Sequence, residues 1–447
     1  KQFNQENRLE FMNNKNKTIL LGLNELNFDY IKFYINEGKL PNFKKLFEIQ
    51  TPLETISEKE YRLLEPWVQW VTIHSGKTFK EHNIFRLGDI VNNPELSQIF
   101  EELESEGLSV GAVSPFNAEN RLKKPSFFVP DPWTKTNPSG NWIVKALYEA
   151  VHQSVNDNAK SKLNLKSMIS LGLGLLLYVP ISRWFHYVKT VSKAKNPGAK
   201  AVVLDSLLAD VHLTLWKKYK PDFSNLFLNS GAHIQHHYLF NSKAYLGNIK
   251  NPEWYCPKDY DPLINILSEY DKQIGKLLKQ KDVKIIIATG LHQQPHEHLT
   301  FYWRLKEHVK FAEMIGIKNF SEILPRMSRD FLVKFNNQLD AVNAEKLLNS
   351  FYASKDDIKI FEVDNRGASL FVELVYPNDI TDNDSIYSKE SNLKLEKFKS
   401  YLAFVAIKNG EHNGIGYVTS NFDLKQKEKI ELTSLKSIIK KVALSEN

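Results

Sequence analysis

Cysteine is nearly absent from this sequence, which has a single one, Cys256, among its 447 residues. One cysteine excludes an intramolecular disulfide framework and any zinc cluster built from several thiolates. Such cysteine usage is typical of a reducing compartment, so we expect a cytoplasmic protein. No secretory signal is visible at the start of the chain, and one removed earlier would leave no trace in it.

A long apolar run is also lacking. The longest apolar stretch, Met168 to Ile181, has about 14 residues, against the roughly 20 that a spanning helix needs. It belongs to the segment Leu163 to Lys195, in which Trp184, Phe185 and Tyr187 follow beside lysine and arginine. Two interpretations stay open: a hairpin within the core, or a helical projection that touches a membrane surface or a lipid-linked substrate. The second would make the protein a peripheral membrane protein.

The third feature that the sequence lacks is a dense basic stripe. Its net charge of +7 comes mostly from lysines spread along the chain. We therefore expect no nucleic-acid partner, because dedicated readers concentrate basic and aromatic residues on one face. An excess of positive charge does favour acidic partners, such as phosphorylated sugars, nucleotides and anionic lipid headgroups.

Short apolar runs alternate with segments of helical period along the chain. The runs that we interpret as strands are Thr18 to Leu23, Leu108 to Val113, Lys200 to Leu204, Asn225 to Leu228 and Val283 to Ala288. The helical segments include Phe28 to Glu37, Pro94 to Glu106 and Pro262 to Lys279. This alternation predicts an α/β fold with a doubly wound, mostly parallel sheet.

Three of these strands end at titratable or amide residues. Asn24 and Glu25 follow the first strand, His233 and His236 follow the strand that ends at Leu228, and His292 follows the strand that ends at Ala288. In open α/β sheets, ligands bind at the carboxyl ends of the strands. Imidazole nitrogens there are competent for proton transfer or metal binding, although histidines at a helix start can also only pack or cap.

We expect one α/β/α core interrupted by two variable regions. Residues 15–117 would form the first part of the core, 118–199 a helical insertion and 200–300 the second part of the core. Residues 301–362 would form a cap or lid, and 363–447 would return to the core, beginning with a strand from Ala368 to Val375.

Five motifs occur in a fixed order along the chain. They are Leu20 to Glu25 with Gly38 to Phe43, Trp70 to Gly76 with Glu81 to Phe85, Gly231 to His237, Ala288 to Gln293, and Glu411 to Gly416. In this order they resemble the alkaline phosphatase superfamily, specifically its type I phosphodiesterase/nucleotide pyrophosphatase branch. The resemblance implies an alkaline phosphatase-like α/β/α sandwich. It also implies an enzyme whose two divalent metals, held by three aspartates and three histidines, clamp a transferring phosphoryl group beside a Thr or Ser nucleophile.

The sequence departs from this family pattern at the residues that do the chemistry. Asn24, Ala232 and Leu291 (or Gly290 under a one-residue shift) stand where the family has its aspartates. The stretch matched to the nucleophile, Leu64 to Trp67, contains no hydroxyl or thiol. We therefore expect no two-metal centre, because histidines alone do not offset the charge of two dications. At most one divalent metal would bind, through His236, His412 and a Glu, or none at all.

Polar residues nevertheless remain dense in the matched loops. Glu65, next to Pro66 and Trp67, is a candidate acid or base with a raised pKa. The candidate catalytic residues are Glu65, His236 and His292. The candidate metal ligands are His236 and His412, and the candidate substrate-binding residues are Asn24, Glu25, Gln69, His74, His233 and Arg366, the last through its guanidinium. We expect Asn24, Glu25, Glu65, Gly231, His236, His292 and His412 to converge at the carboxyl edge of the sheet.

Two classes of function stay open on these residues. The first is an enzyme acting on a phosphate-containing or nucleotide-activated small molecule or a lipid-linked glycan. A phosphodiesterase or phosphatase is the family default, whereas a metal-independent transferase in surface-glycan biosynthesis fits the residues better. The second class is a pseudoenzyme, in which the fold is kept for binding or assembly.

Overall fold

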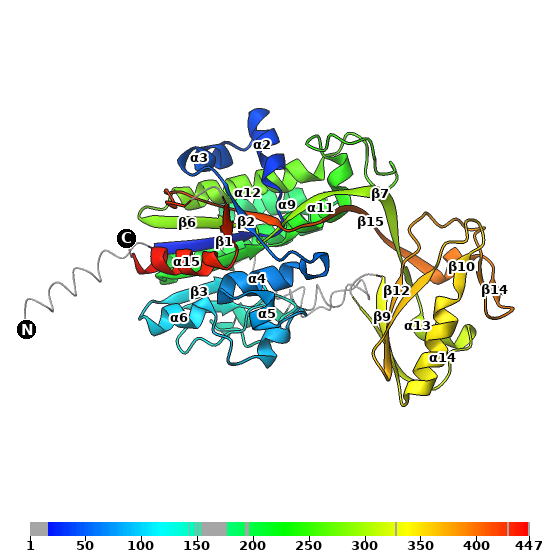
Figure 1. Cartoon of the computed structure of the whole chain (residues 1–447). Coiled ribbons are helices and arrows are strands. Elements are labelled where there is room, and N and C mark those ends of the chain that lie inside the picture. The colour runs from blue at the N-terminus through cyan, green and yellow to red at the C-terminus, as the bar shows by residue number, and fades with distance from the viewer. Residues whose placement is uncertain are drawn as a thin grey trace, which may run out of the picture. The chain divides into compact units, whose positions relative to one another are not determined.

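The computed structural model describes residues 17–142, 144–146, 148–149, 152, 177–192, 196–326, 329–426 and 429–445 (Figure 1). The chain divides into two compact units. Unit 1 comprises Lys1–Gly247, Pro252–Pro295 and Gly410–Asn447, and unit 2 comprises Asn248–Asn251 and His296–Asn409. No helix among the described residues has the length and apolarity needed to cross a bilayer.

Unit 1 is built on an eight-stranded sheet. In spatial order its strands are β17 (Lys429–Glu431), β2 (Leu53–Ile56), β16 (Ile415–Ser420), β6 (Val283–Ala288), β1 (Lys17–Leu23), β5 (Phe223–Leu228), β3 (Val110–Val113) and β4 (Phe127–Val129). From β6 to β4 all neighbouring pairs are parallel, whereas β16 runs antiparallel to both β6 and β2. The central strand β1 is buried along its whole length after Lys17, as an apolar strand covered on both faces should be.

Helices cover both faces of this sheet. One layer contains α2 (Phe28–Asn36), α3 (Pro41–Ile49), α9 (Ile181–Ser192), α10 (Ala199–Tyr219), α11 (Ser230–Tyr238) and α12 (Pro262–Leu278). The other contains α4 (Pro66–Ser75), α5 (Phe79–His82), α6 (Ile99–Ser105) and α15 (Ser434–Leu444). In Figure 1, α3 and α12 lie on one side of the sheet and α4 and α6 on the other. The doubly wound, mostly parallel α/β architecture expected from the sequence is thereby confirmed.

Unit 2 has its own small sheets. A four-stranded antiparallel sheet has the order β11 (Phe361–Asn365), β12 (Ser369–Leu374), β9 (Asp330–Phe335) and β8 (Phe320–Pro325), and a three-stranded one the order β10 (Phe351–Ala353), β13 (Ile386–Ser388) and β14 (Lys394–Leu395). Helices α13 (His308–Met314) and α14 (Gln338–Asn349) belong to the same unit. Strands β7 (His292–Leu305) and β15 (Leu402–Asn413) pair with each other, and both are shared between the units.

One strand expected from the sequence is a helix, and another is a strand that belongs to a different part of the fold than expected. Lys200 to Leu204 is the start of helix α10, because its apolar residues continue at helical spacing through Leu207, Val211 and Leu215. The strand expected to return to the core, Ala368 to Val375, is β12 of unit 2. Its alternation of buried and half-buried residues is that of an antiparallel strand with one covered face, and unit 2 continues to Asn409.

The region expected as a helical insertion begins later than residue 118, because Phe127–Val129 is strand β4 of the main sheet. Within the segment Leu163 to Lys195, residues 163–176 and 193–195 lie outside the described residues.

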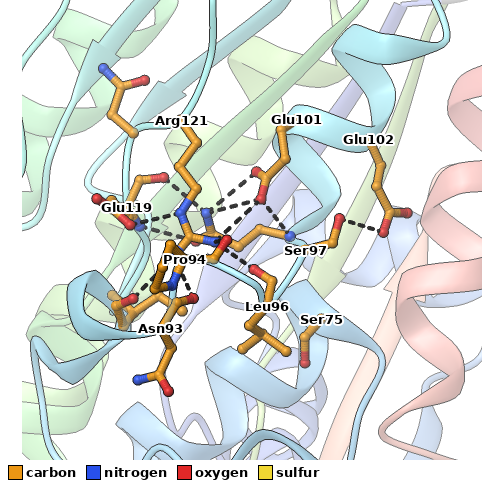
Figure 2. A network of polar contacts seen from close by, with 12 residues as sticks. Ser75, Asn93, Pro94, Leu96, Ser97, Glu101, Glu102, Glu119 and Arg121 are labelled. Carbon is orange, nitrogen blue, oxygen red and sulfur yellow. Dashed lines mark hydrogen bonds and ion pairs between the residues drawn. The ribbon is translucent and has the colours of Figure 1, made fainter.

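Arg121 joins the loop after β3 to the segment before α6 (Figure 2). Its guanidinium donates to the carbonyls of Ile90, Asn93 and Leu96 at 3.1, 2.9 and 2.6 Å, and to the Glu119 carboxylate at 2.7 Å. Arginine in a pocket often binds phosphate. Here its donors are already committed to backbone oxygens, so Arg121 has a structural role.

Candidate functional site

Three donor atoms from distant parts of the chain meet at the carboxyl edge of the sheet. Glu25 follows β1, His236 lies in the last turn of α11, and His412 lies near the end of β15. The Glu25 Oε2 atom is 2.9 Å from His236 Nε2 and 3.1 Å from His412 Nε2. The two Nε2 atoms are 3.3 Å apart. We call these residues the Glu25 triad.

The backbone of Glu25 is held in an uncommon conformation. Its φ of 56° lies in the left-handed region, which non-glycine residues rarely adopt unless their surroundings enforce it. The Glu25 N–H donates to the carbonyl of Thr289 at 3.1 Å, and the side-chain amide of Gln235 donates to the Glu25 carbonyl at 2.9 Å. This strained turn aims the carboxylate at the two imidazoles.

Two further amides hold the Glu25 carboxylate. Gln293 donates to Oε2 at 2.6 Å and Asn24 donates to Oε1 at 2.9 Å. Burial by itself would raise the pKa of this carboxyl. His412 and His236 outweigh burial and hold the pKa well below its ordinary value. Glu25 is therefore an anion fixed between two imidazoles.

Glu65 extends the triad on the other side of His412. It stands just before helix α4, and its Oε2 atom is 3.8 Å from His412 Nδ1. Burial raises the pKa of Glu65 to about 7, with the nearby charge of Glu25 adding to the rise and His412 opposing it. A carboxyl whose pKa lies close to neutrality can both give and accept a proton, which is what general acid–base catalysis requires.

A buried tryptophan fills the space beside Asn24. Trp70 from α4 is fully buried, and its indole N–H donates to Asn24 Oδ1 at 2.8 Å. Gly22 makes room for this ring, since a Cβ atom there would lie 2.6 Å from the Trp70 side chain. Asn24 also donates to Asn229 at 2.7 Å. The position matched to the family's first aspartate is thus an amide packed against an indole, which is a poor place for a second metal ion.

The donor set of the Glu25 triad fits one divalent ion. Zinc bonds of about 2.0–2.1 Å at tetrahedral angles separate donor atoms by about 3.3 Å, and two histidines with one glutamate are a known zinc ligand set. The three observed separations, 2.9, 3.1 and 3.3 Å, lie within a few tenths of an ångström of that value. Among the residues that the structure describes, this is the group of His, Cys, Asp and Glu side chains that could hold a metal ion.

Five of the seven residues expected to converge at the carboxyl edge of the sheet lie close together in the structure. Asn24, Glu25, Glu65, His236 and His412 all belong to the connected set described above. Gly231 does not line it. A Cβ atom on Gly231 would meet Leu26 and Tyr270, so this glycine serves the packing of α11.

His292, expected to be catalytic, makes structural contacts instead. Its Nδ1 atom lies 2.6 Å from the carbonyl oxygen of Ile415, and its ring packs on Tyr417. Burial lowers its pKa, which favours the neutral form. These contacts hold β16 against the end of β6.

Four residues expected to bind substrate make other contacts in the structure. His74 is buried in the core against Trp70 and Phe100, and buried Gln69 donates to the carbonyl of Leu63 at 2.7 Å. Arg366 belongs to unit 2, where it is paired with Asp364 at 2.7 Å. His233 is exposed, with its ring against that of His237.

Sequence reasoning missed the amides that orient the triad. Gln235, Gln293 and Asn229 each follow or lie near a strand end, but glutamine and asparagine are common in loops and carry no distinctive signal. The contact of Trp70 with Asn24 was also missed, because a tryptophan in an apolar helix is usually a core residue without a role in a site.

No family model matches the chain, and no curated protein matches its sequence. Several solved structures are similar to it. Phosphonoacetate hydrolase from Sinorhizobium meliloti 1021, in complex with phosphonoacetate, is 12% identical with a TM-score of 0.46, and 96% of each chain is covered. Murine ectonucleotide pyrophosphatase/phosphodiesterase 5 is 10% identical with a TM-score of 0.41, covering 94% of this chain and 93% of the other.

The alkaline phosphatase of the Antarctic bacterium TAB5 is 10% identical with a TM-score of 0.40, covering 96% of this chain and 98% of the other. These three proteins belong to the superfamily that the strand-end motifs resemble.

Proposed function

We propose that this chain is an alkaline phosphatase-fold enzyme that acts on a phosphate-containing substrate at a mononuclear site. In this proposal Glu25, His236 and His412 hold one divalent ion, and Glu65 moves the proton. The observation that carries it is the meeting of three donor atoms within 3.3 Å, with Glu65 3.8 Å from one of the rings. A divalent ion held there supplies positive charge for a phosphate oxygen.

The stretch matched to the nucleophile, Leu64 to Trp67, contains no hydroxyl or thiol. Without an enzyme nucleophile, the attacking oxygen comes from water or from a hydroxyl of an acceptor. Glu65, as its carboxylate, takes the proton of that hydroxyl while the new P–O bond forms and the bond to the leaving group breaks. Attack by water makes the reaction a hydrolysis, and attack by a sugar hydroxyl makes it a transfer.

We favour a phosphorylated or nucleotide-activated small molecule, or a lipid-linked glycan, as the substrate. The triad carries one fixed carboxylate and Glu65 carries another, so a phosphate group would need the positive charge of the ion to bind. Transfer in surface-glycan biosynthesis is one form of this chemistry and phosphodiester hydrolysis is the other. The amide of Asn24, which stands where the family has its first aspartate and accepts from the indole of Trp70, favours the non-catalytic alternative, a binding protein that keeps the fold.

Metal binding is the first test. Titration calorimetry and elemental analysis of the wild-type chain should give one equivalent of zinc or manganese. His236→Gln should weaken binding at least 100-fold, because it removes one of three ligands. His233→Gln, on the same helix but exposed, is the matched control and should bind as the wild type does. Two equivalents per chain, or equal affinity of both variants, would overturn the mononuclear site.

Turnover is the second test. A chromogenic phosphodiester and nucleotide sugars, offered with water or with sugar acceptors, should be consumed by the wild type. Glu65→Gln should lower kcat by about 10²–10⁴-fold, the usual contribution of a general acid–base group, with metal affinity unchanged. Metal binding without turnover of any of these substrates would leave the binding-protein alternative standing.

A further inference from the structure

Among the described side chains of helix α9, Arg183 and Tyr187 face the neighbouring helices, whereas several large apolar side chains are exposed. Arg183 donates from Nε to Asp210 at 2.7 Å and from Nη2 to Glu269 at 2.7 Å. The Tyr187 hydroxyl donates to Asp210 at 2.9 Å. Asp210 and Glu269, on α10 and α12, are buried, so these contacts attach α9 firmly to the helical layer.

The opposite side of α9 presents large apolar side chains to solvent. Ile181, Phe185 and Val188 are 78%, 77% and 67% exposed. Trp184 is 38% exposed, and Leu177 in the preceding turn is 53% exposed. The spacing of three and four residues places Ile181, Trp184, Phe185 and Val188 along one stripe of α9. Leu177 lies in the helical turn before Pro180, where the helix is interrupted. We call these five residues the α9 stripe.

The helix cannot bury this stripe by rotating about its own axis. Rotation would break the Arg183 ion pairs and leave Asp210 and Glu269 buried without their guanidinium partner, which is strongly unfavourable. The apolar face is therefore fixed outward. Exposed apolar surface of this kind marks a contact with a partner or with a membrane.

Exposed cations lie next to one end of the stripe. The carbonyl of Tyr178, which follows Leu177, accepts a hydrogen bond of 2.7 Å from Thr214 on α10. Lys217 and Lys218 are exposed and lie one turn further along α10. The combination of apolar and aromatic residues with adjacent lysines matches the two layers of a membrane interface, acyl chains and anionic headgroups.

We propose that the α9 stripe, with Lys217 and Lys218, docks this protein on an anionic membrane surface. A second copy of the chain fits the stripe less well, because a standard protein interface uses roughly 20–30 residues a side and the stripe has five. Docking is peripheral, with the helix lying in the headgroup region. This surface is separate from the Glu25 triad and does not depend on the function proposed for it.

Sedimentation with vesicles tests the proposal. The full chain is mixed with vesicles of phosphatidylcholine alone and of phosphatidylcholine with phosphatidylglycerol, at low and high salt. The wild type should bind the anionic vesicles more tightly, and part of this binding should be lost at high salt. Ile181→Ser/Phe185→Ser should lower the partition coefficient at least tenfold, and Lys217→Ser/Lys218→Ser should remove most of the salt dependence.

A matched control separates the stripe from apolar exposure in general. Leu246 and Leu339 are 86% and 70% exposed elsewhere in the chain. Leu246→Ser/Leu339→Ser should leave vesicle binding unchanged. Equal partitioning of the wild type and Ile181→Ser/Phe185→Ser, with both folded by circular dichroism, would refute membrane docking. Membrane docking would also be refuted if the wild type bound no vesicles and formed a dimer that Ile181→Ser/Phe185→Ser dissociates.

Discussion

His74 should make the fold sensitive to mild acid. Its side chain is buried, and neither ring nitrogen has a hydrogen-bond partner among the described residues. Burial lowers the pKa of His74 to about 3, and the nearby charge of Lys436 adds to the effect. In the unfolded chain the same imidazole titrates near its ordinary value of about 6.5.

The direction of the effect follows from these two values. Above about pH 6.5 both states hold a neutral imidazole, and the full stability is present. As the pH falls below that value, the unfolded chain takes up a proton that the folded chain refuses until about pH 3. The free energy of unfolding then falls by about 1.4 kcal/mol for each pH unit. Between pH 7.5 and pH 5 the loss attributable to His74 is about 2 kcal/mol.

Urea denaturation at pH 7.5 and pH 5 measures this loss. His74→Leu removes the titrating group and keeps an apolar side chain against Phe100, so its stability should fall by about 2 kcal/mol less than that of the wild type over this range. His298→Leu, at an exposed position of β7, is the control and should keep the wild-type difference. If His74→Leu and the wild type lose the same free energy between the two pH values, the imidazole is not held neutral by burial and the reasoning fails.

Two further predictions concern the supports of the site and of α9. Gly410→Ala should weaken metal binding by about 10–100-fold, because the new Cβ would lie 2.0 Å from Gln293 Oε1 and 2.9 Å from the carbonyl of Gln235, and both residues orient Glu25. Calorimetric titration with zinc checks this, and wild-type affinity would contradict it. Arg183→Met should lower the free energy of unfolding by about 3 kcal/mol, the low end for breaking a buried pair, because Glu269 and Asp210 lose their guanidinium while Asp210 keeps Lys276 at 2.8 Å. In urea denaturation, Arg366→Met, which breaks a surface pair, should cost less than about 1 kcal/mol, and similar costs for the two variants would contradict the argument.

The sequence predicted where the site lies along the chain better than it predicted which side chains form it. Strands β1, β5 and β6 could be located because a buried parallel strand is a short apolar run, and Glu25 and His236 follow two of them. His292 follows the third, yet its ring packs on Tyr417. Position in the chain fixes the strand end at which a residue lies, but the direction of its side chain depends on packing between distant segments.

The same limit explains the other errors. The apolar run at the start of α10 has the composition of a strand, and only its continuation over 21 residues decides for a helix. Glu65 belongs to the stretch matched to the nucleophile and His74 to the motif Trp70 to Gly76 that follows it, but Glu65 faces His412 and His74 faces the core. The left-handed backbone of Glu25 could not be predicted from the sequence. It is held by contacts with Thr289 and Gln235, which are distant from Glu25 along the chain.

The indole of Trp70 also limits how this chain could change. A single exchange, Asn24→Asp, would restore a carboxylate at the first position of the family pattern, and one of its oxygens would take the place of the amide oxygen that accepts from the indole N–H. The new charge would lie in a buried site beside Glu25, where two like charges repel. Gly22, which makes room for that ring, shows that backbone and side chain are adapted to each other at this position.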